Sequence, residues 1–197
     1  MNEVSIQRKK EHYFTFEIPI EYDNKHPINN VEEYIKDLFP DKLIPMIRQI
    51  IGYSMTNLYD LKKFFILFGN DGDNGKSIFV NLIFKNILGK FYGSVNENLF
   101  YKQTKNSGQA QAFYNTLEGK RTGVLSETSN DTQADNAKIK RLTGGDDFTF
   151  RGLFEKEEKE MVCKAKLFLN TNRTIQFDTS DDPFLKRILI IPFINKF

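Results

Sequence analysis

A glycine-rich stretch that ends in a lysine and a serine has the residue types of a phosphate-binding loop. Backbone N–H groups of such a loop, with the positive end of a following helix, can surround a β-phosphate, and the lysine can reach the β- and γ-phosphates. The serine hydroxyl is a typical Mg²⁺ ligand. The stretch therefore predicts a nucleoside-triphosphate site with Mg²⁺. Its residues are Gly69, Asn70, Asp71, Gly72, Asp73, Asn74, Gly75, Lys76 and Ser77.

The spacing of this loop departs from the usual pattern. Four residues normally separate the first glycine from the Gly-Lys-Ser ending, whereas five separate Gly69 from Gly75. Either Gly72 permits a one-residue bulge, or Asn70 takes the first-glycine position. A plain turn and a calcium loop have similar compositions. A calcium loop is disfavoured, because aligning Gly75 with its invariant glycine puts Asn81 where the bidentate glutamate belongs.

A carboxylate follows a second apolar segment. Glu127 comes directly after Gly123-Val124-Leu125-Ser126, which is typical of a buried strand. An ATPase needs an acid near Mg²⁺ and the attacking water, at the end of a neighbouring strand. We therefore predict Glu127 as catalytic base and as part of the metal site with Ser77. The alternative is a solvated glutamate at a strand end.

Alternating strands and helices would position these residues. The run FFILF at 64–68 is apolar without alternation, which indicates a strand buried on both faces, and an apolar helix that must be heavily covered follows at 76–88. The pattern predicts an α/β fold with a mostly parallel sheet and helices on its faces. Further strands are expected at 121–126, 166–169 and 188–191, and further helices at 110–117 and 134–142.

The chain is expected to have two parts. Residues 1–60 form an N-terminal extension, with a strand-like lead-in over about 25 residues and then two helices in a collar-like segment. Residues 61–197 form the α/β core.

Composition limits the classes of protein that remain. One cysteine and two histidines cannot build a zinc site or an internal disulfide, so a metal must be held by oxygen. The net charge of +2 does not by itself indicate nucleic-acid binding. Residues 1–12 lack the features of a signal peptide, and no run approaches the ~20 apolar residues of a membrane span. We expect a soluble, intracellular protein with no membrane partner.

Five motifs in order resemble those of superfamily 3 helicases. They are GNDGDNGKS, LEGKRTGVLSET, KIKRLTGGDDFTFR, KAKLFLNTN and DDPFLKRILIIPF, and the similarity covers roughly residues 17–193. More narrowly, the chain resembles the helicase part of primase-helicases of poxviruses and other large DNA viruses, phages and plasmids. The resemblance implies an AAA+-like ATPase that binds ATP and Mg²⁺, forms a hexameric ring and unwinds DNA by translocating on a single strand.

The resemblance also implies roles for single residues. Lys76, Ser77 and Glu127 match the phosphate, magnesium and acidic residues. Asn172 matches the polar sensor that places the attacking water, with Asn170 as a near alternative.

The last motif carries a cation. Arg187 matches the arginine that reaches a neighbouring subunit's γ-phosphate, and Lys186 is a weaker substitute because a planar guanidinium suits spread phosphate charge better. A plain Asn turn at Asn172 and a surface charge at Arg187 are the alternatives.

Residues 138–166 match the family's DNA-contacting region, where a hairpin projects into the pore. Cations there can follow a phosphate backbone and aromatic rings can stack on bases. Interleaved glutamates make an ordinary solvated hairpin the alternative. The candidate contacts are Arg151, Lys156 and Lys159, with Phe150 and Phe154 beside them.

Other functions stay open at this point. The roughly 60 residues before the first core strand leave no room for a primase domain, so a separate primase domain or protein could be a partner. If the chain is viral, its site of action would be the host cytoplasm or a viral replication site. The alternative functions are a packaging motor or kinase with a phosphate-binding loop, and an ATP-binding assembly module with weak or no turnover.

Overall fold

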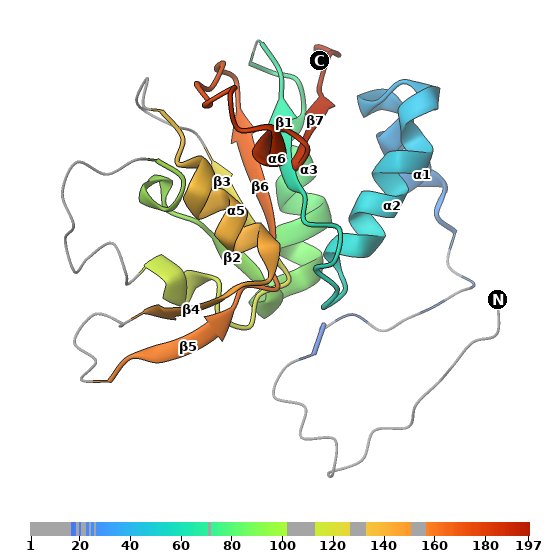
Figure 1. Cartoon of the computed structure of the whole chain (residues 1–197). Coiled ribbons are helices and arrows are strands. Elements are labelled where there is room, and N and C mark those ends of the chain that lie inside the picture. Colours follow the sequence, from blue (N-terminus) through green and yellow to red (C-terminus); the bar gives the residue numbers. More distant parts are fainter. Residues whose placement is uncertain are drawn as a thin grey trace.

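Five parallel strands form the central sheet of the computed structural model, in the order β2-β3-β6-β1-β7 (Figure 1). The structure describes residues 17–18, 20, 23, 25, 27–70, 72–101, 113–126, 133–150 and 157–197. Helices flank the sheet, which confirms the predicted α/β class. The strands are β1 Phe64–Phe68, β2 Tyr92–Ser94, β3 Thr122–Ser126, β6 Lys166–Thr171 and β7 Ile188–Pro192.

The central strand β1 is buried on both faces. Phe65 and Leu67 belong to one hydrophobic cluster, and Phe64 and Ile66 belong to another on the opposite face. Strands covered on both faces need apolar side chains at every position, which is why the FFILF run does not alternate. β1 pairs with β6 on one side and with β7 on the other.

Helices from two parts of the chain cover one face of the sheet. Phe39, Phe79 and Phe193 meet edge to face, with ring centroids 4.8–5.7 Å apart. Residues on both sides of position 60 therefore build one hydrophobic core. The helices on this face are α1 Asn29–Leu38, η2 Asp41–Leu43, α2 Ile44–Ser54, α3 Lys76–Phe79 and the π-helical η3 Val80–Asn86.

The helix after the loop is helical over the predicted range but is not covered all round. Ile78 is 57% exposed and Leu82 is 46% exposed, whereas Phe79, Val80 and Phe84 are buried against the sheet. The expectation of heavy cover on every face was therefore wrong, because these two residues point away from the cluster that buries the other side.

The opposite face of the sheet carries shorter helices and a hairpin. Asp135 caps α5 by accepting a hydrogen bond from the Lys138 N–H at 3.0 Å, and Gly145, with φ 78°, ends it. Figure 1 shows the antiparallel pair of β4 and β5 apart from the main sheet. The elements are η5 Glu97–Leu99, η6 Phe113–Thr116, α5 Asn136–Gly144, β4 Asp147–Phe150, β5 Lys159–Val162 and α6 Asp182–Leu185. The short helix η4 Gly89–Phe91 belongs to the first face, because Phe91 packs against the cluster there.

Several expectations are limited by the described residues. The strand-like lead-in falls mostly outside them, and of the helix expected at 110–117 they show the short helix η6. Within the described parts of the chain, no helix has the length and apolar character needed to cross a bilayer.

Candidate nucleotide site

The glycine-rich loop lies where the carboxyl ends of three strands meet. Phe68 at the end of β1 lies beside Thr171 of β6 and Pro192 of β7. A Cβ atom on Gly69 would lie 2.3 Å from Asn74 Nδ2 and 2.9 Å from the Phe193 carbonyl oxygen. Only glycine allows the chain to approach so closely at this point.

The turn into the helix uses two left-handed residues among those described in the loop. Gly75 has φ 81° and Asp73 has φ 56°. Gly72 has no positive φ, and a Cβ atom there would meet nothing within 4 Å. The backbone and its surroundings thus create no steric need for glycine at position 72, although the sequence suggested a bulge there.

Lys76 begins α3 and is only 5% exposed. Its Nζ donates to Asn74 Oδ1 at 2.8 Å, to the Gly69 carbonyl oxygen at 3.4 Å and to Asn172 Oδ1. These three acceptors are neutral, and two of them are amides on rotatable side chains. A phosphate oxygen would be a stronger acceptor for the same ammonium, because it carries a negative charge that the three present acceptors lack.

Asn172 reaches the lysine because β6 lies next to β1 in the sheet. The two residues are 96 positions apart in the chain. Asn170 is buried instead, opposite Leu67 on one side and Ser126 on the other. Of the two asparagines named from the sequence, Asn172 is the one that contacts Lys76.

A cleft of about 400 Å³ opens beside the loop, on the side of β7. The segment after β7 forms its second wall, because the Phe193 N–H donates to the Phe68 carbonyl at 2.7 Å and the Phe197 N–H donates to the Asp73 carbonyl at 2.9 Å. Sequence reasoning missed this wall, which has no motif of its own. The lining residues are Phe68, Gly69, Asn70, Gly72, Asn74, Pro192, Phe193, Ile194, Asn195 and Lys196.

Of the two predicted metal ligands, Ser77 is among the described residues and Glu127 is not. Ser77 lies in the first turn of α3 and is exposed. Glu127 lies outside the described residues. The strand before it, β3, ends at Ser126, which pairs with Asn170 and is one strand removed from β1.

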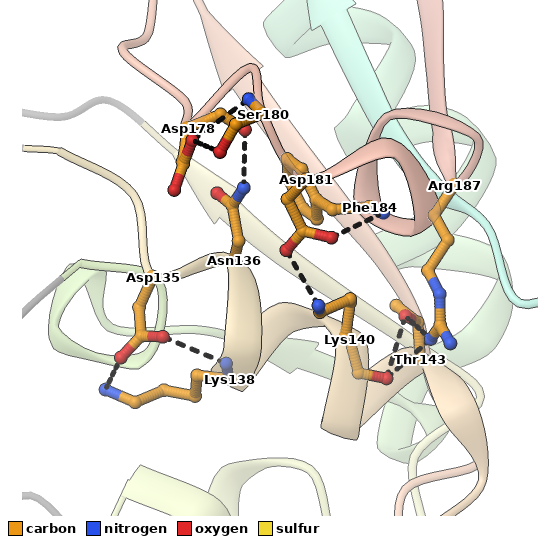
Figure 2. Close-up of polar contacts among 10 residues, drawn as sticks. All are labelled: Asp135, Asn136, Lys138, Lys140, Thr143, Asp178, Ser180, Asp181, Phe184 and Arg187. Atoms are coloured by element: carbon orange, nitrogen blue, oxygen red, sulfur yellow. Dashed lines mark hydrogen bonds and ion pairs between the residues drawn. The ribbon is translucent and has the colours of Figure 1, made fainter.

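Arg187 lies where the strands of the sheet begin, at the end opposite to the loop. It precedes β7, whose first residue Ile188 pairs with Phe64, and five strand residues span about 16 Å. Arg187 Nη1 donates to the Lys140 carbonyl at 2.5 Å and to Thr143 Oγ1 at 2.9 Å (Figure 2). The arginine is therefore held against α5, far from the loop of its own chain.

Lys76, Asn172 and Arg187 all lie in the part of the chain that matches a known protein family. The sequence pattern of the group described as "Family of unknown function (DUF5906)" matches residues 67–187. The chain belongs to this family.

Relatives with names come from large DNA viruses. "Putative helicase L207/L206" of Acanthamoeba polyphaga mimivirus is 28% identical over 181 residues, covering 91% of this chain and 18% of the relative. "Putative helicase 121R" of Invertebrate iridescent virus 3 is 26% identical over 180 residues, covering 89% of this chain and 19% of the relative. The chain thus spans about a fifth of the length of these relatives. The predicted resemblance to helicases of large DNA viruses is confirmed.

Solved structures share the fold. The C-terminal region of NrS-1 superposes with a TM-score of 0.61 at 19% identity, over 90% of this chain and 40% of that chain. The JCV helicase superposes with a TM-score of 0.52 at 13% identity, over 83% of this chain and 44% of that one. Both agree with the α/β class expected for this member of the family.

The hairpin of this family member is only partly described. Lys159 begins β5, is exposed and pairs with Phe150. Arg151 and Lys156 lie outside the described residues, as does Phe154. Phe150 is 1% exposed and packs in the core near Tyr114, with ring centroids 5.9 Å apart. Phe150 thus lies beside Lys159 as expected, but its buried ring faces the hydrophobic cluster and is not available to stack on a base.

A second buried lysine lies at the amino edge of the sheet. Lys166 is 3% exposed, and its Nζ donates to the carbonyl oxygens of Thr56, of Leu58 at 3.2 Å and of Lys164 at 3.5 Å. Burial, with the nearby charge of Arg121, lowers the pKa of Lys166 to about 8. Sequence reasoning did not single out this residue.

The lysine belongs to a set of core side chains that hold the end of α2. Arg121 Nη1 donates to the Met55 carbonyl at 2.8 Å, and Thr122 Oγ1 donates to the Ser54 carbonyl at 3.1 Å. Carbonyls at a helix end lack partners within the helix and attract cations. These contacts therefore tie the helical part to the sheet. Cys163 nearby is buried, which raises the pKa of its thiol to about 11 and makes it a poor nucleophile.

Proposed function

We propose that the chain is the ATP-hydrolysing core of a replicative DNA helicase. The observation that carries the proposal is the contact of Lys76 with both Asn74 and Asn172 beside an open cleft. This arrangement joins the loop to the end of a neighbouring strand, as a γ-phosphate site requires. The names of the viral relatives support a helicase-type function.

The residues present fit ATP with Mg²⁺. Lys76 would exchange its amide partners for phosphate oxygens, and the N–H groups of the loop would surround the β-phosphate. Ser77 and Glu127 would hold Mg²⁺, which supplies charge neutralisation at the β- and γ-phosphates when bound. Asn172 would orient the attacking water, and Glu127 would accept its proton.

Arg187 is proposed to complete the site of a neighbouring copy. Held about a strand's length from its own loop, it cannot serve that loop, so one copy alone has an incomplete site. The proposal therefore includes a closed ring, hexameric as the resemblance implies, because head-to-tail contacts between identical copies generate rings.

Mixing two inactive variants tests this arrangement. Lys76→Ala copies keep Arg187, and Arg187→Ala copies keep Lys76, so a mixed ring contains some sites with both groups. We expect each variant alone to hydrolyse ATP at least about 100-fold more slowly than the unaltered chain, and the mixture to recover activity. Mixtures that stay as inactive as their components, or a dilute Arg187→Ala protein with normal turnover, contradict the trans arginine.

DNA is the proposed track. Lys159, with Arg151 and Lys156, would contact a single strand in the centre of the ring, and residues 1–60 would serve as a collar that helps the 61–197 core to assemble. A primase domain or protein is a proposed partner, in keeping with the greater length of the relatives. The proposed site of action is inside a host cell, in the cytoplasm or at a viral replication site.

DNA-stimulated hydrolysis tests the function as a whole. The rate of phosphate release is measured with and without single-stranded DNA, and Lys76→Ala controls for contaminating ATPases. Stimulation several-fold above the basal rate is expected. Hydrolysis that ignores DNA favours another kind of ATPase, such as a packaging motor, and ATP binding without turnover favours an assembly module.

A further inference from the structure

One face of α5 holds the segment that carries Arg187. Asn136, Lys140 and Thr143 are spaced four and three residues apart, so they lie on the same side of the helix. Figure 2 shows all three directed at this segment. Asn136 Nδ2 donates to the Asp178 carbonyl at 2.9 Å, and Lys140 Nζ lies 2.7 Å from Asp181 Oδ2. Thr143 Oγ1 accepts a hydrogen bond from Arg187 Nη1 at 2.9 Å.

The segment is fixed at both of its ends. Asp181 caps α6 by accepting from the Phe184 N–H at 3.2 Å, and its second carboxylate oxygen binds Lys140. The hydrogen bond from Lys140 is the main cause that lowers the pKa of Asp181. Since the short helix α6 connects Asp181 to Arg187, the position of the arginine depends on α5 at two points.

The contacts of Arg187 are of a kind that a phosphate can replace. Its two acceptors, the Lys140 carbonyl and the Thr143 hydroxyl, are neutral. They lie in the second half of α5, where the helix dipole favours a cation. A phosphate binds a guanidinium more strongly than either contact, because it adds a full negative charge and can accept two parallel hydrogen bonds. The arginine is therefore stably held but free to be exchanged.

The same end of α5 leads directly into the hairpin. Gly145 ends the helix and β4 begins at Asp147. The turn is closely packed, because a Cβ atom on Gly145 would lie 2.6 Å from the ring of Tyr59. Only two residues, Gly145 and Asp146, therefore separate the last turn of α5 from the hairpin.

We propose that Thr143 is a positioning residue, which with the Lys140 carbonyl holds Arg187 in a resting position. When a neighbouring copy presents a γ-phosphate, Arg187 leaves α5, and the end of that helix and the adjoining hairpin are released together. Conversely, DNA that displaces the hairpin frees the arginine for hydrolysis. This inference rests on the proposed function, because it needs both the trans arginine and a DNA-contacting hairpin.

A pair of substitutions at one position tests it. Thr143→Val removes the hydroxyl and keeps the shape of the side chain, whereas Thr143→Ser keeps the hydroxyl. We expect Thr143→Val to raise basal hydrolysis and to lower the ratio of DNA-stimulated to basal rate by about threefold or more, since changes along a coupling route are of that order. Thr143→Ser should retain the ratio.

Two further measurements keep the outcomes separate. Thermal unfolding of each variant reports a purely structural role, and a lower midpoint in Thr143→Val with an unchanged stimulation ratio overturns the inference. If Thr143→Val does not fold, Asp181→Asn weakens the second anchor and should lower the same ratio; an unchanged ratio there overturns it too. If the unaltered chain hydrolyses no ATP, the proposed function itself fails, and this inference with it.

Discussion

Two buried lysines, at opposite ends of the parallel strands, are held in different ways. Lys76 at the carboxyl edge is bound by the side-chain amides of Asn74 and Asn172, next to a cleft. Lys166 at the amino edge is bound by main-chain carbonyls, including those of Thr56 and Leu58. Side-chain amides can turn away from an ammonium at little cost, whereas main-chain carbonyls in a packed turn cannot.

The comparison separates a cation held mainly by rotatable side chains beside a cleft from a cation that fastens two elements of the fold. Nζ of Lys166 also lies 5.1 Å from the centre of the Tyr53 ring, so its contacts are with fixed parts of the fold. Loss of the charge at Lys76 should therefore affect chemistry, and loss of the charge at Lys166 should affect stability. Lost stability in a Lys76 variant together with lost hydrolysis in a Lys166 variant would contradict this distinction.

The largest expected effect is on hydrolysis in Lys76→Ala. The rate should fall at least about 100-fold, because the ammonium stabilises charge that develops on the phosphates. Urea unfolding should give a midpoint close to that of the unaltered chain, since the released amides can reach water in the cleft. A protein that has lost most of its stability would show that Lys76 is also a structural clamp.

Asn172→Ala should have the next largest effect. Hydrolysis should fall about 10- to 100-fold because the amide no longer orients the attacking water, while nucleotide affinity stays within a few-fold. Asn170→Ala is not a matched control, because Asn170 is buried in the sheet. Asn86→Ala, at the exposed end of η3, makes the same substitution away from the site and is a suitable surface control. Equal rates for Asn172→Ala and that control would exclude a catalytic role for Asn172.

Lys166→Met should lower the free energy of unfolding by about 1–3 kcal/mol, because the carbonyls of Thr56 and Leu58 lose a buried donor. Nucleotide binding should remain, since the loop is at the other edge of the sheet. Urea unfolding and nucleotide titration measure the two quantities. Unchanged stability together with lost binding would reverse the assignment of the two lysines.

The smallest expected effect is a pH dependence that comes from Lys166. Its pKa of about 8 in the folded chain lies below the ordinary value for lysine, so between these values the unfolded chain binds more protons. Stability should therefore rise with pH in this window. Below it, the folded chain must bury a charged ammonium, so the destabilising effect of that burial is fully present. The difference in unfolding free energy between the chain and Lys166→Met should grow by about 1 kcal/mol from about pH 7.5 to 9. A difference that shrinks or stays constant contradicts the lowered pKa.

Much of the fold and of the phosphate site could be predicted because the signals are local. A strand without alternation, a glycine-rich turn and a lysine follow one another in the chain, and parallel strands bring their carboxyl ends to one edge. That rule is enough to place Asn172 near Lys76, although 96 positions separate them.

The remaining features depend on contacts between distant segments. A lysine at the start of a strand is usually solvated, and the burial of Lys166 arises from carbonyls 110 and 108 positions earlier in the chain. The wall of the cleft formed by residues 192–196 needs the turn after β7, which has no signature. Arg187 could be named from a motif, but its attachment to Thr143 follows only from the packing of α6 on α5.

The strand order also determines when the backbone groups of each strand can form hydrogen bonds during synthesis. β1 lies between β6 and β7, so neither edge of the FFILF segment has a neighbour until residues beyond 166 have been made. At about 5–20 residues per second, a ribosome takes on the order of ten seconds to reach that point. Throughout this interval an apolar strand with open edges is exposed to other chains. A nascent chain stalled before β6 should therefore aggregate unless a chaperone covers the segment.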